Sequence, residues 1–484
     1  MGLQAAMVAR IAGAWPLVAL LLSWQALLTS CVSAPAAVDT HGMHDLSLTP
    51  PFERMASLVT PHGYPLEEHF VTTEDGYILR LFRVPHGRGP PPRAALPRPP
   101  RPVVHLQHGL LGASSDWALN GPGFSLLFIL ADAGYDVWLG NVRANAYSRN
   151  HTTLGFLDPA FWAFTWDDIA GRDLPAMLAR ELEVAGAESL AYVGHSQGTT
   201  VALALLSSQP HWARRIRIAV LLAPVAFATH IESTPLVALA KLNTDEVFTL
   251  LGLLEFLPSS EVLSRLDGQL CRFQPHLCVN LLAMICGYND ANVDTSRLPI
   301  YLNYTPSGTS VQNMAHWCQA MRSHDPTEMT FFDFGTRCTT ILGAPRPCNQ
   351  RRYGTASPPR YNFSAIAAPL ALFTGGQDRL ADPADAALLL AKLPRGRVLT
   401  WHSDADYEHL DYLWGVNAHS RVYGRVMALL EAHGGGGSGG GAGREGGGGG
   451  GGGGGVEWRR QGVAVLARWW RRARRRWRMD GGGA

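Results

Sequence analysis

The sequence predicts an α/β fold with a mostly parallel central sheet, helices on both faces and an inserted helical cap. Short apolar runs of strand length alternate with helical stretches through the first half of the chain. Such alternation is typical of parallel strands whose connecting helices cover both sides of the sheet. The alternation then stops, because helical segments dominate from about residue 227 to residue 330 and the next apolar run begins at Leu370. This interval is too long for a loop in a compact domain, so it predicts a helical insertion.

The individual elements follow from the spacing of apolar residues and turn residues. Residues 63 to 79 are predicted to form two strands, joined by a turn at Glu74-Asp75-Gly76. Further strands are expected at Val103–Leu106, Tyr135–Leu139, Leu190–Val193, Ile218–Leu222, Leu370–Phe373 and Val398–Trp401. Helices are expected at Thr165–Arg180, Thr199–Leu206, Thr234–Leu257 and Leu277–Ile285. The stretch from His86 to Pro102 is rich in proline and arginine and is expected to be a solvated loop.

A glycine-flanked serine lies where one predicted strand meets the next helix. The sequence Gly194-His195-Ser196-Gln197-Gly198 has the G-x-S-x-G spacing of a nucleophile elbow, a turn so tight that bulky neighbours do not fit. Such a turn lifts the serine hydroxyl clear of the sheet. It also points the Gln197 N–H into the space beside that hydroxyl, at a helix start where negative charge is favoured. The pentapeptide also occurs in ordinary turns, but the flanking strand and helix favour Ser196 as a nucleophile and Gln197 as an oxyanion donor.

A serine nucleophile needs a base and a carboxylate that orients the base. In α/β folds with a nucleophile elbow, these residues follow along the chain in the order Ser, Asp, His. Asp378 lies in the loop after the strand predicted at 370–373 and is the candidate orienter. His409 follows the next predicted strand and is the candidate base. Five other aspartates compete with Asp378 in this part of the chain: Asp382, Asp385, Asp404, Asp406 and Asp411.

The loop after the strand at 103–106 is the expected source of a second oxyanion donor. In this type of fold the loop after the third strand contributes one N–H group, and Leu110 lies at the corresponding place. An ordinary strand-to-helix turn is the alternative. The neighbouring His108 is expected to make structural hydrogen bonds rather than to transfer protons.

Charge is unevenly distributed along the 484 residues, which carry a net charge of +2. Residues 1 to 433 hold 31 basic and 36 acidic residues, a net of −5, because nine arginines are concentrated after Val456. The body therefore lacks the basic excess that a nucleic-acid backbone requires, and no nucleic-acid partner is expected. There is no C-x-x-C and no paired Cys/His cluster, so no metal site is expected. Serine chemistry also requires no cofactor.

Both ends of the chain differ from the body. Residues 1–34 contain a long apolar stretch followed by small residues, and they are expected to be a secretory signal peptide. An uncleaved membrane anchor and a lipoprotein cleavage box are the alternatives. Residues 45–433 form the predicted main domain, with the cap at about 227–330, and the glycine-rich residues 434–455 form a linker. Residues 456–484 are expected to be a disordered basic tail, with an amphipathic helix on anionic membrane as the alternative.

Cysteines and sequons agree with the secretory pathway. Six cysteines lie beyond the signal peptide, an even number that permits three disulfides in an oxidising compartment. Cys338 and Cys348 flank a loop and are candidates to pair. Among Cys271, Cys278 and Cys286, two are spaced to bridge while one stays buried and free. Glycosylation sequons begin at Asn150, Asn303 and Asn362.

Eight blocks in order, between about Pro61 and Leu430, resemble the acid lipase family of animals, which includes gastric and lysosomal acid lipases. The blocks are GYPLEEH, TEDGYIL, HGLLGASSDW, GYDVWLGNVR, GHSQGTT, GTSVQNM, LADPAD and HLDYLWG. The resemblance implies an α/β-hydrolase fold with a cap, with Ser196, Asp378 and His409 matching the family's triad. Leu110 and Gln197 match its oxyanion donors. The loops at residues 86–101 and 336–352 exceed the family pattern and affect no catalytic position.

The predicted function is hydrolysis of a lipid ester, triacylglycerol or cholesteryl ester, at a lipid–water interface by a secreted or lysosomal enzyme. The cap is rich in Leu, Val, Phe and Ile, which favours burial of acyl chains at ~0.8 kcal/mol per methylene. Peripheral membrane contact through the basic tail is part of this hypothesis. A general carboxylesterase, a serine acyltransferase and a non-catalytic lipid-binding protein with the same fold remain alternatives.

Overall fold

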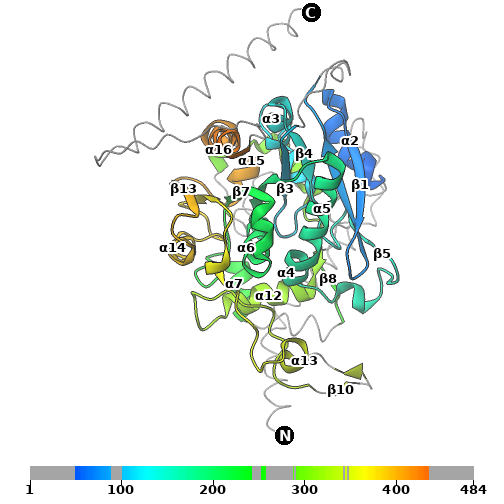
Figure 1. Cartoon of the computed structure of the whole chain (residues 1–484), viewed down its shortest axis with the longest axis vertical. Helices are drawn as coiled ribbons and strands as arrows, with labels where there is room; N and C mark the ends of the chain where they lie inside the picture. The colour runs from blue at the N-terminus through cyan, green and yellow to red at the C-terminus, as the bar shows by residue number, and fades with distance from the viewer. Residues whose placement is uncertain are drawn as a thin grey trace, which may run out of the picture.

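The computed structural model describes residues 49–88, 101–241, 252–257, 287, 290–338, 340–341, 344–345 and 348–434 (Figure 1). Several predictions fall outside these residues: the signal peptide, the glycine-rich linker, the basic tail, most of the proline- and arginine-rich loop, the helix expected at 277–285 and the cysteines at positions 271, 278 and 286. Among the described residues, no helix is long and apolar enough to cross a membrane.

A nine-stranded sheet forms the centre of the molecule and confirms the predicted fold class (Figure 1). Its strands follow the order β1-β2-β4-β3-β6-β7-β12-β13, and β5 pairs with β2. The strands are β1 (Glu67–Thr72), β2 (Tyr77–Val84), β3 (Val103–Gln107), β4 (Asp136–Leu139), β5 (Asn150–His151), β6 (Leu190–His195), β7 (Ile216–Leu222), β12 (Leu370–Gly375) and β13 (Val398–Asp404). The pairings from β4 through β13 are parallel, whereas β1, β2 and β5 pair antiparallel.

Helices cover both faces of this sheet and bury almost every residue of its central strands. Every residue of β6 and of β12 is buried, which requires packing on both sides. Helix α5 (Leu174–Ala185) and helix α6 (Gln197–Ser208) contact each other and the sheet (Figure 1). Helix α3 (Leu126–Asp132) packs on β4, helix α14 (Pro383–Lys392) on β12, and helix α16 (Gly424–Gly434) on β7.

The segment between β7 and β12 contains strands as well as helices, which corrects the prediction in two places. Its helices among the described residues are α7 (Thr234–Lys241), α11 (Leu298–Tyr304), α12 (Val311–Met321) and α13 (Asn349–Tyr353). The helix expected at 234–257 is wrong at its end, because β8 (Glu255–Phe256) pairs antiparallel with β9 (Thr309–Ser310). The sequence also predicts no strand here, yet β10 (Thr340–Ile341) pairs with β11 (Ala344–Pro345). Two residues are too few to show the alternation that identifies a strand.

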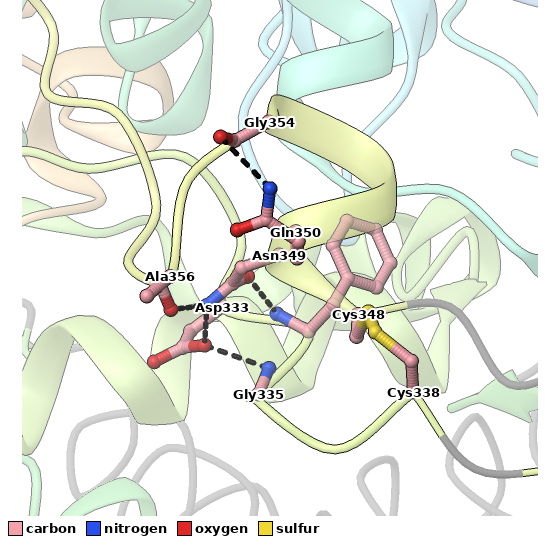
Figure 2. The surroundings of a disulfide bond; sticks show 9 residues. Asp333, Gly335, Cys338, Cys348, Asn349, Gln350, Gly354 and Ala356 are labelled. Carbon is pink, nitrogen blue, oxygen red and sulfur yellow. Dashed lines mark hydrogen bonds between the residues drawn. A yellow bond between two sulfur atoms is a disulfide. The ribbon is translucent and has the colours of Figure 1, made fainter.

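A disulfide closes the loop between Cys338 and Cys348, as the sequence predicts (Figure 2). Cys338 and Cys348 are bonded, with Cα atoms 5.1 Å apart. Beside the bond, Asn349 Nδ2 donates to Asp333 Oδ1 at 2.7 Å, and Gly335 N–H donates to the same oxygen at 2.7 Å. The loop is therefore held at its base by a covalent bond and by a hydrogen-bonded aspartate.

Candidate active site

Ser196 lies at the junction of β6 and α6 in a strained backbone conformation. Its φ is 54° and its ψ is −123°, a region that residues with a side chain rarely occupy. The strain is held from both sides, since Ser196 N–H donates to the Leu222 carbonyl at 3.1 Å and Thr199 N–H donates to the Ser196 carbonyl at 2.8 Å. The sharp turn predicted from the pentapeptide is therefore present, and the side chain of Ser196 is half-buried.

The two glycines of the pentapeptide are required by close backbone contacts. A Cβ atom on Gly198 would lie 2.5 Å from the carbonyl oxygen of Gln107, and one on Gly194 would lie 2.8 Å from the backbone of Gly198. Both distances are shorter than atoms tolerate. The start of α6 can therefore approach β3 and β6 closely only because these positions carry no side chain.

Asp378 and His409 meet in the interior, although 31 residues separate them in the chain. The Nδ1 atom of His409 lies 3.0 Å from each carboxylate oxygen of Asp378. The same carboxylate accepts the N–H groups of Leu380 at 2.9 Å and Ala381 at 2.7 Å. Because this carboxylate accepts all these bonds, Nδ1 of His409 is the donor and carries a proton. Nε2 of His409 is then the ring nitrogen that can accept one.

The other aspartates that compete with Asp378 are committed to different partners. Asp385 Oδ1 is 2.6 Å from His230 Nδ1, and Asp382 accepts the N–H of Ala384 at the start of α14. Asp404 and Asp406 both pair with Arg421. Asp411 accepts the N–H of Glu408 at 2.9 Å. Of the six aspartates, Asp378 is the one whose carboxylate contacts His409.

His195 connects the serine turn to the histidine loop, and sequence reasoning missed it. Its Nε2 atom donates to the carbonyl oxygen of His409 at 2.9 Å, and the two rings lie 4.9 Å apart. Burial lowers the pKa of His195 to about 3, so the ring is neutral and serves as a hydrogen-bond donor. The only signal in the sequence is its position directly before Ser196.

The loop that carries Leu110 reaches the serine turn. A Cβ atom on Gly109 would lie 2.8 Å from the Cβ of Ser196, so the two segments are in contact. The N–H groups of Leu110 and Gln197 make no hydrogen bond to any described residue. The two segments that carry these N–H groups meet beside Ser196.

His108 is a structural residue of the same loop, as the sequence predicts. Its Nδ1–H donates to the Gly109 carbonyl at 2.8 Å, and its Nε2 accepts the N–H of Val142 at 3.3 Å. Burial lowers the pKa of His108 to about 4, which keeps the ring neutral. Both ring nitrogens are engaged, so neither is free for proton transfer.

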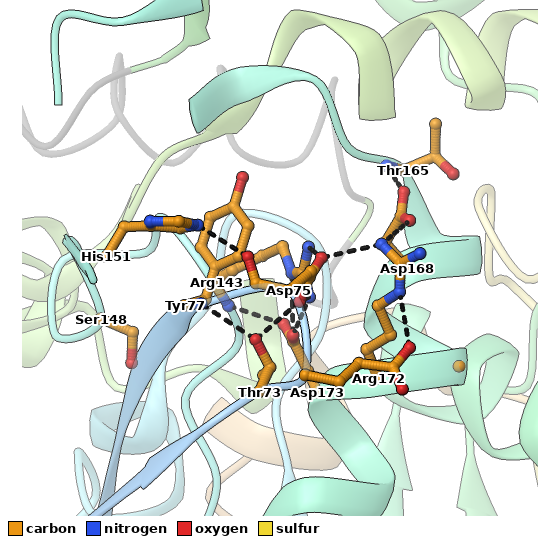
Figure 3. A network of polar contacts seen from close by, with 12 residues as sticks. Thr73, Asp75, Tyr77, Arg143, Ser148, His151, Thr165, Asp168, Arg172 and Asp173 are labelled. Carbon is orange, nitrogen blue, oxygen red and sulfur yellow. Dashed lines mark hydrogen bonds and ion pairs between the residues drawn. The ribbon is translucent and has the colours of Figure 1, made fainter. Parts of the chain in front are cut away.

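A buried arginine ties the β1–β2 turn to the segment after β4 (Figure 3). The guanidinium of Arg143 pairs with Asp173 at 2.6 Å and with Asp75 at 2.8 Å, and it lies 3.9 Å from the Tyr77 ring centroid. Burial alone raises the pKa of Asp75, but hydrogen bonds and the charge of Arg143 outweigh it and hold that pKa well below its usual range. Asp75 therefore stays ionised at acid pH.

This network reaches the loop that carries Leu110. Asn145 lies in the same segment as Arg143, and its Nδ2 donates to His108 Nε2 at 3.2 Å.

Among the described residues no group of three His, Cys, Asp or Glu side chains is arranged to hold a metal ion.

The sheet order, the strained serine between strand and helix, and the buried aspartate–histidine pair define an α/β-hydrolase. Two family models agree with this class. One, described as "alpha/beta hydrolase fold", matches residues 102–416, and the other, a "partial alpha/beta-hydrolase lipase region", matches residues 55–121.

Similarity to known proteins is high over most of the chain. Human lysosomal acid lipase/cholesteryl ester hydrolase is 40% identical over 382 residues, which are 78% of this chain and 91% of the relative. Human gastric triacylglycerol lipase is 39% identical over 384 residues, covering 78% and 90%. Mouse lipase member K is 39% identical over 412 residues, covering 84% and 98%. The chain belongs to the acid lipase family and is a serine ester hydrolase, as the sequence resemblance predicts.

Proposed function

We propose that this lipase hydrolyses triacylglycerol or cholesteryl ester through an acyl-enzyme formed on Ser196. The observation that carries the proposal is the contact of His409 Nδ1 with both carboxylate oxygens of Asp378 at 3.0 Å. The same histidine loop touches His195, the residue before Ser196. The names of two relatives support the substrate class, since one is a cholesteryl ester hydrolase and the other a triacylglycerol lipase.

The proposed reaction begins when Ser196 Oγ attacks the ester carbonyl carbon and His409 Nε2 takes its proton. Asp378 accepts the Nδ1–H and stabilises the imidazolium. The tetrahedral oxyanion accepts hydrogen bonds from the N–H groups of Leu110 and Gln197. Collapse of this intermediate breaks the ester bond, and His409 gives the proton to the leaving alcohol.

Water completes the cycle. His409 Nε2 removes a proton from a water molecule as its oxygen attacks the acyl carbonyl, and the same two N–H groups receive the second oxyanion. Collapse of that intermediate breaks the bond to Ser196 Oγ, which recovers its proton from His409 and releases a fatty acid. These steps use only groups of the protein and one water.

The enzyme is proposed to work in the secretory pathway, as a secreted or lysosomal protein, with residues 1–34 as its signal peptide. Of the proposed glycosylation sites, Asn150 and Asn362 are exposed and Asn303 is half-buried. The segment at 227–330 is proposed to bury acyl chains at a lipid interface. Exposed Leu253 (48%) and Leu257 (39%) in this segment support that role. The basic tail at 456–484 is proposed to contact anionic membrane.

The test compares long-chain triacylglycerol, cholesteryl ester and a short soluble ester at acid and neutral pH. The proposal expects the rate to rise at a lipid interface and kcat/KM to rise with chain length. Ser196→Ala should lower kcat by ~10⁵ to 10⁶-fold with little loss of stability, and a serine-directed phosphonate should label wild type at Ser196. A preference for short soluble esters without a rise at the interface would indicate a general carboxylesterase. Faster transfer to an added alcohol than to water would indicate an acyltransferase.

A further inference from the structure

The side chain of Gln197 is held by two residues of α12. Trp317 Nε1–H donates to Gln197 Oε1 at 2.8 Å, and Asn313 Nδ2 donates to the same oxygen at 3.0 Å. All three side chains are buried: Asn313 is 0% exposed, Gln197 4% and Trp317 6%. An amide oxygen has two acceptor sites, so these two bonds satisfy it completely and set the direction of the side chain.

Helix α12 is itself firmly placed. Asn313 and Trp317 lie four residues apart on this helix and so project from the same face. At the start of the helix, Ser310 Oγ accepts the N–H of Asn313 at 2.9 Å and donates to the Phe164 carbonyl at 2.7 Å. The Trp317 ring packs 4.5 Å from that of Trp166. Both donors to Gln197 are therefore presented from a fixed support.

The contact matters because Gln197 immediately follows the strained residue. Ser196 has a φ of 54°, a conformation that persists only when surrounding groups hold it. The N–H of Gln197 belongs to the peptide group that joins these two residues. Rotation of that peptide relieves the strain and turns the N–H away from the space beside Ser196 Oγ. An anchored Gln197 side chain opposes this rotation.

We propose that Trp317 and Asn313 are positioning residues, which hold Gln197 so that its N–H faces the developing oxyanion. The inference rests on the proposed role of Gln197 as an oxyanion donor. Both residues belong to α12, a helix of the segment between β7 and β12. Losing the anchor should affect the transition state, in which the oxyanion exists, and not the binding of the ester.

Trp317→Phe is the direct test, because it removes the N–H donor and keeps an aromatic ring. Loss of a whole oxyanion donor costs ~10²–10³-fold in kcat, so loss of one support should cost about tenfold, with KM within about twofold of wild type. Trp162→Phe is the matched control, since the buried Trp162 Nε1–H donates to the Phe156 carbonyl at 2.8 Å away from the site. A similar fall in kcat in both variants, or a change confined to KM, overturns the inference.

A double-mutant cycle tests whether Trp317 acts through Gln197. Gln197→Met removes the acceptor and keeps the backbone N–H and the length of the side chain. If the anchor operates as proposed, Trp317→Phe lowers kcat in wild type and has no further effect in the Gln197→Met background. Additive losses overturn the inference. Phosphonate labelling of Ser196 in wild type and loss of turnover in Ser196→Ala test the proposed function separately, so the two ideas fail independently.

Discussion

Asp378→Asn is the substitution whose effect follows most directly from the structure. The two N–H groups of Leu380 and Ala381, at 2.9 and 2.7 Å, hold Oδ1 of residue 378 as an acceptor. Asparagine would keep its oxygen in that position and would turn its NH₂ group toward His409 Nδ1. Nδ1 of the ring would then accept a hydrogen bond from that NH₂ group, and the ring would carry its proton on Nε2, the wrong tautomer for a base.

The expected loss in kcat is ~10⁴-fold, or about 5.5 kcal/mol of transition-state stabilisation. Turnover of a soluble ester is the assay, because it avoids effects of the lipid interface, and the phosphonate should label the variant more slowly in parallel. Asp404→Asn is the matched control, because Asp404 is also buried at the end of a neighbouring strand but pairs with Arg421. Near wild-type turnover in Asp378→Asn together with a large loss in Asp404→Asn would refute the assignment.

Three further predictions follow from the fold. Gly198→Ala should abolish activity or prevent folding, because the added Cβ would lie 2.5 Å from the Gln107 carbonyl oxygen; a soluble, active variant would contradict the close packing of the turn. Partial burial raises the pKa of Glu408 to about 7 in the folded protein, whereas the unfolded chain ionises this residue above pH ~4.5. Wild type therefore loses stability as the pH rises from ~4.5 to 7. Glu408→Gln lacks this loss, so its Tm relative to wild type should be higher at pH 7.5 than at pH 4.5, and a pH-independent difference would count against the shift. Deletion of residues 435–484 should leave Tm and turnover of a soluble ester unchanged and weaken only salt-sensitive binding to anionic vesicles, because a glycine-rich linker contributes no packing; a drop in Tm of several degrees would show that the tail docks on the body.

Much of the fold was accessible from the sequence because the central strands are buried on both faces. A continuous apolar run such as the one in β6 or β12 identifies such a strand without reference to its neighbours. The two-residue ladder of β8 with β9 escaped prediction for the opposite reason, since it carries no periodic pattern. Its pairing depends on the packing of a segment 53 residues further along the chain.

The residues of the candidate site could be proposed from local sequence patterns, but their contacts could not. The positions of Ser196, Asp378 and His409 were proposed from their places at strand ends, because parallel strands bring their carboxyl ends to one edge of the sheet. Sequence alone left five rival aspartates, and only the folded chain assigns them other partners, such as His230 for Asp385 and Arg421 for Asp404.

By itself, the sequence determined the sheet, the tight turn at Ser196 and the family, because each of these has a local pattern of apolar residues, glycines or motif residues. Tertiary structure alone decided which polar groups meet. Asn313 and Trp317 lie 116 and 120 residues from Gln197 in the chain, yet they bond to one oxygen atom of its side chain. No local pattern records such a contact, because its geometry arises only when α12 and α6 pack together in the folded protein.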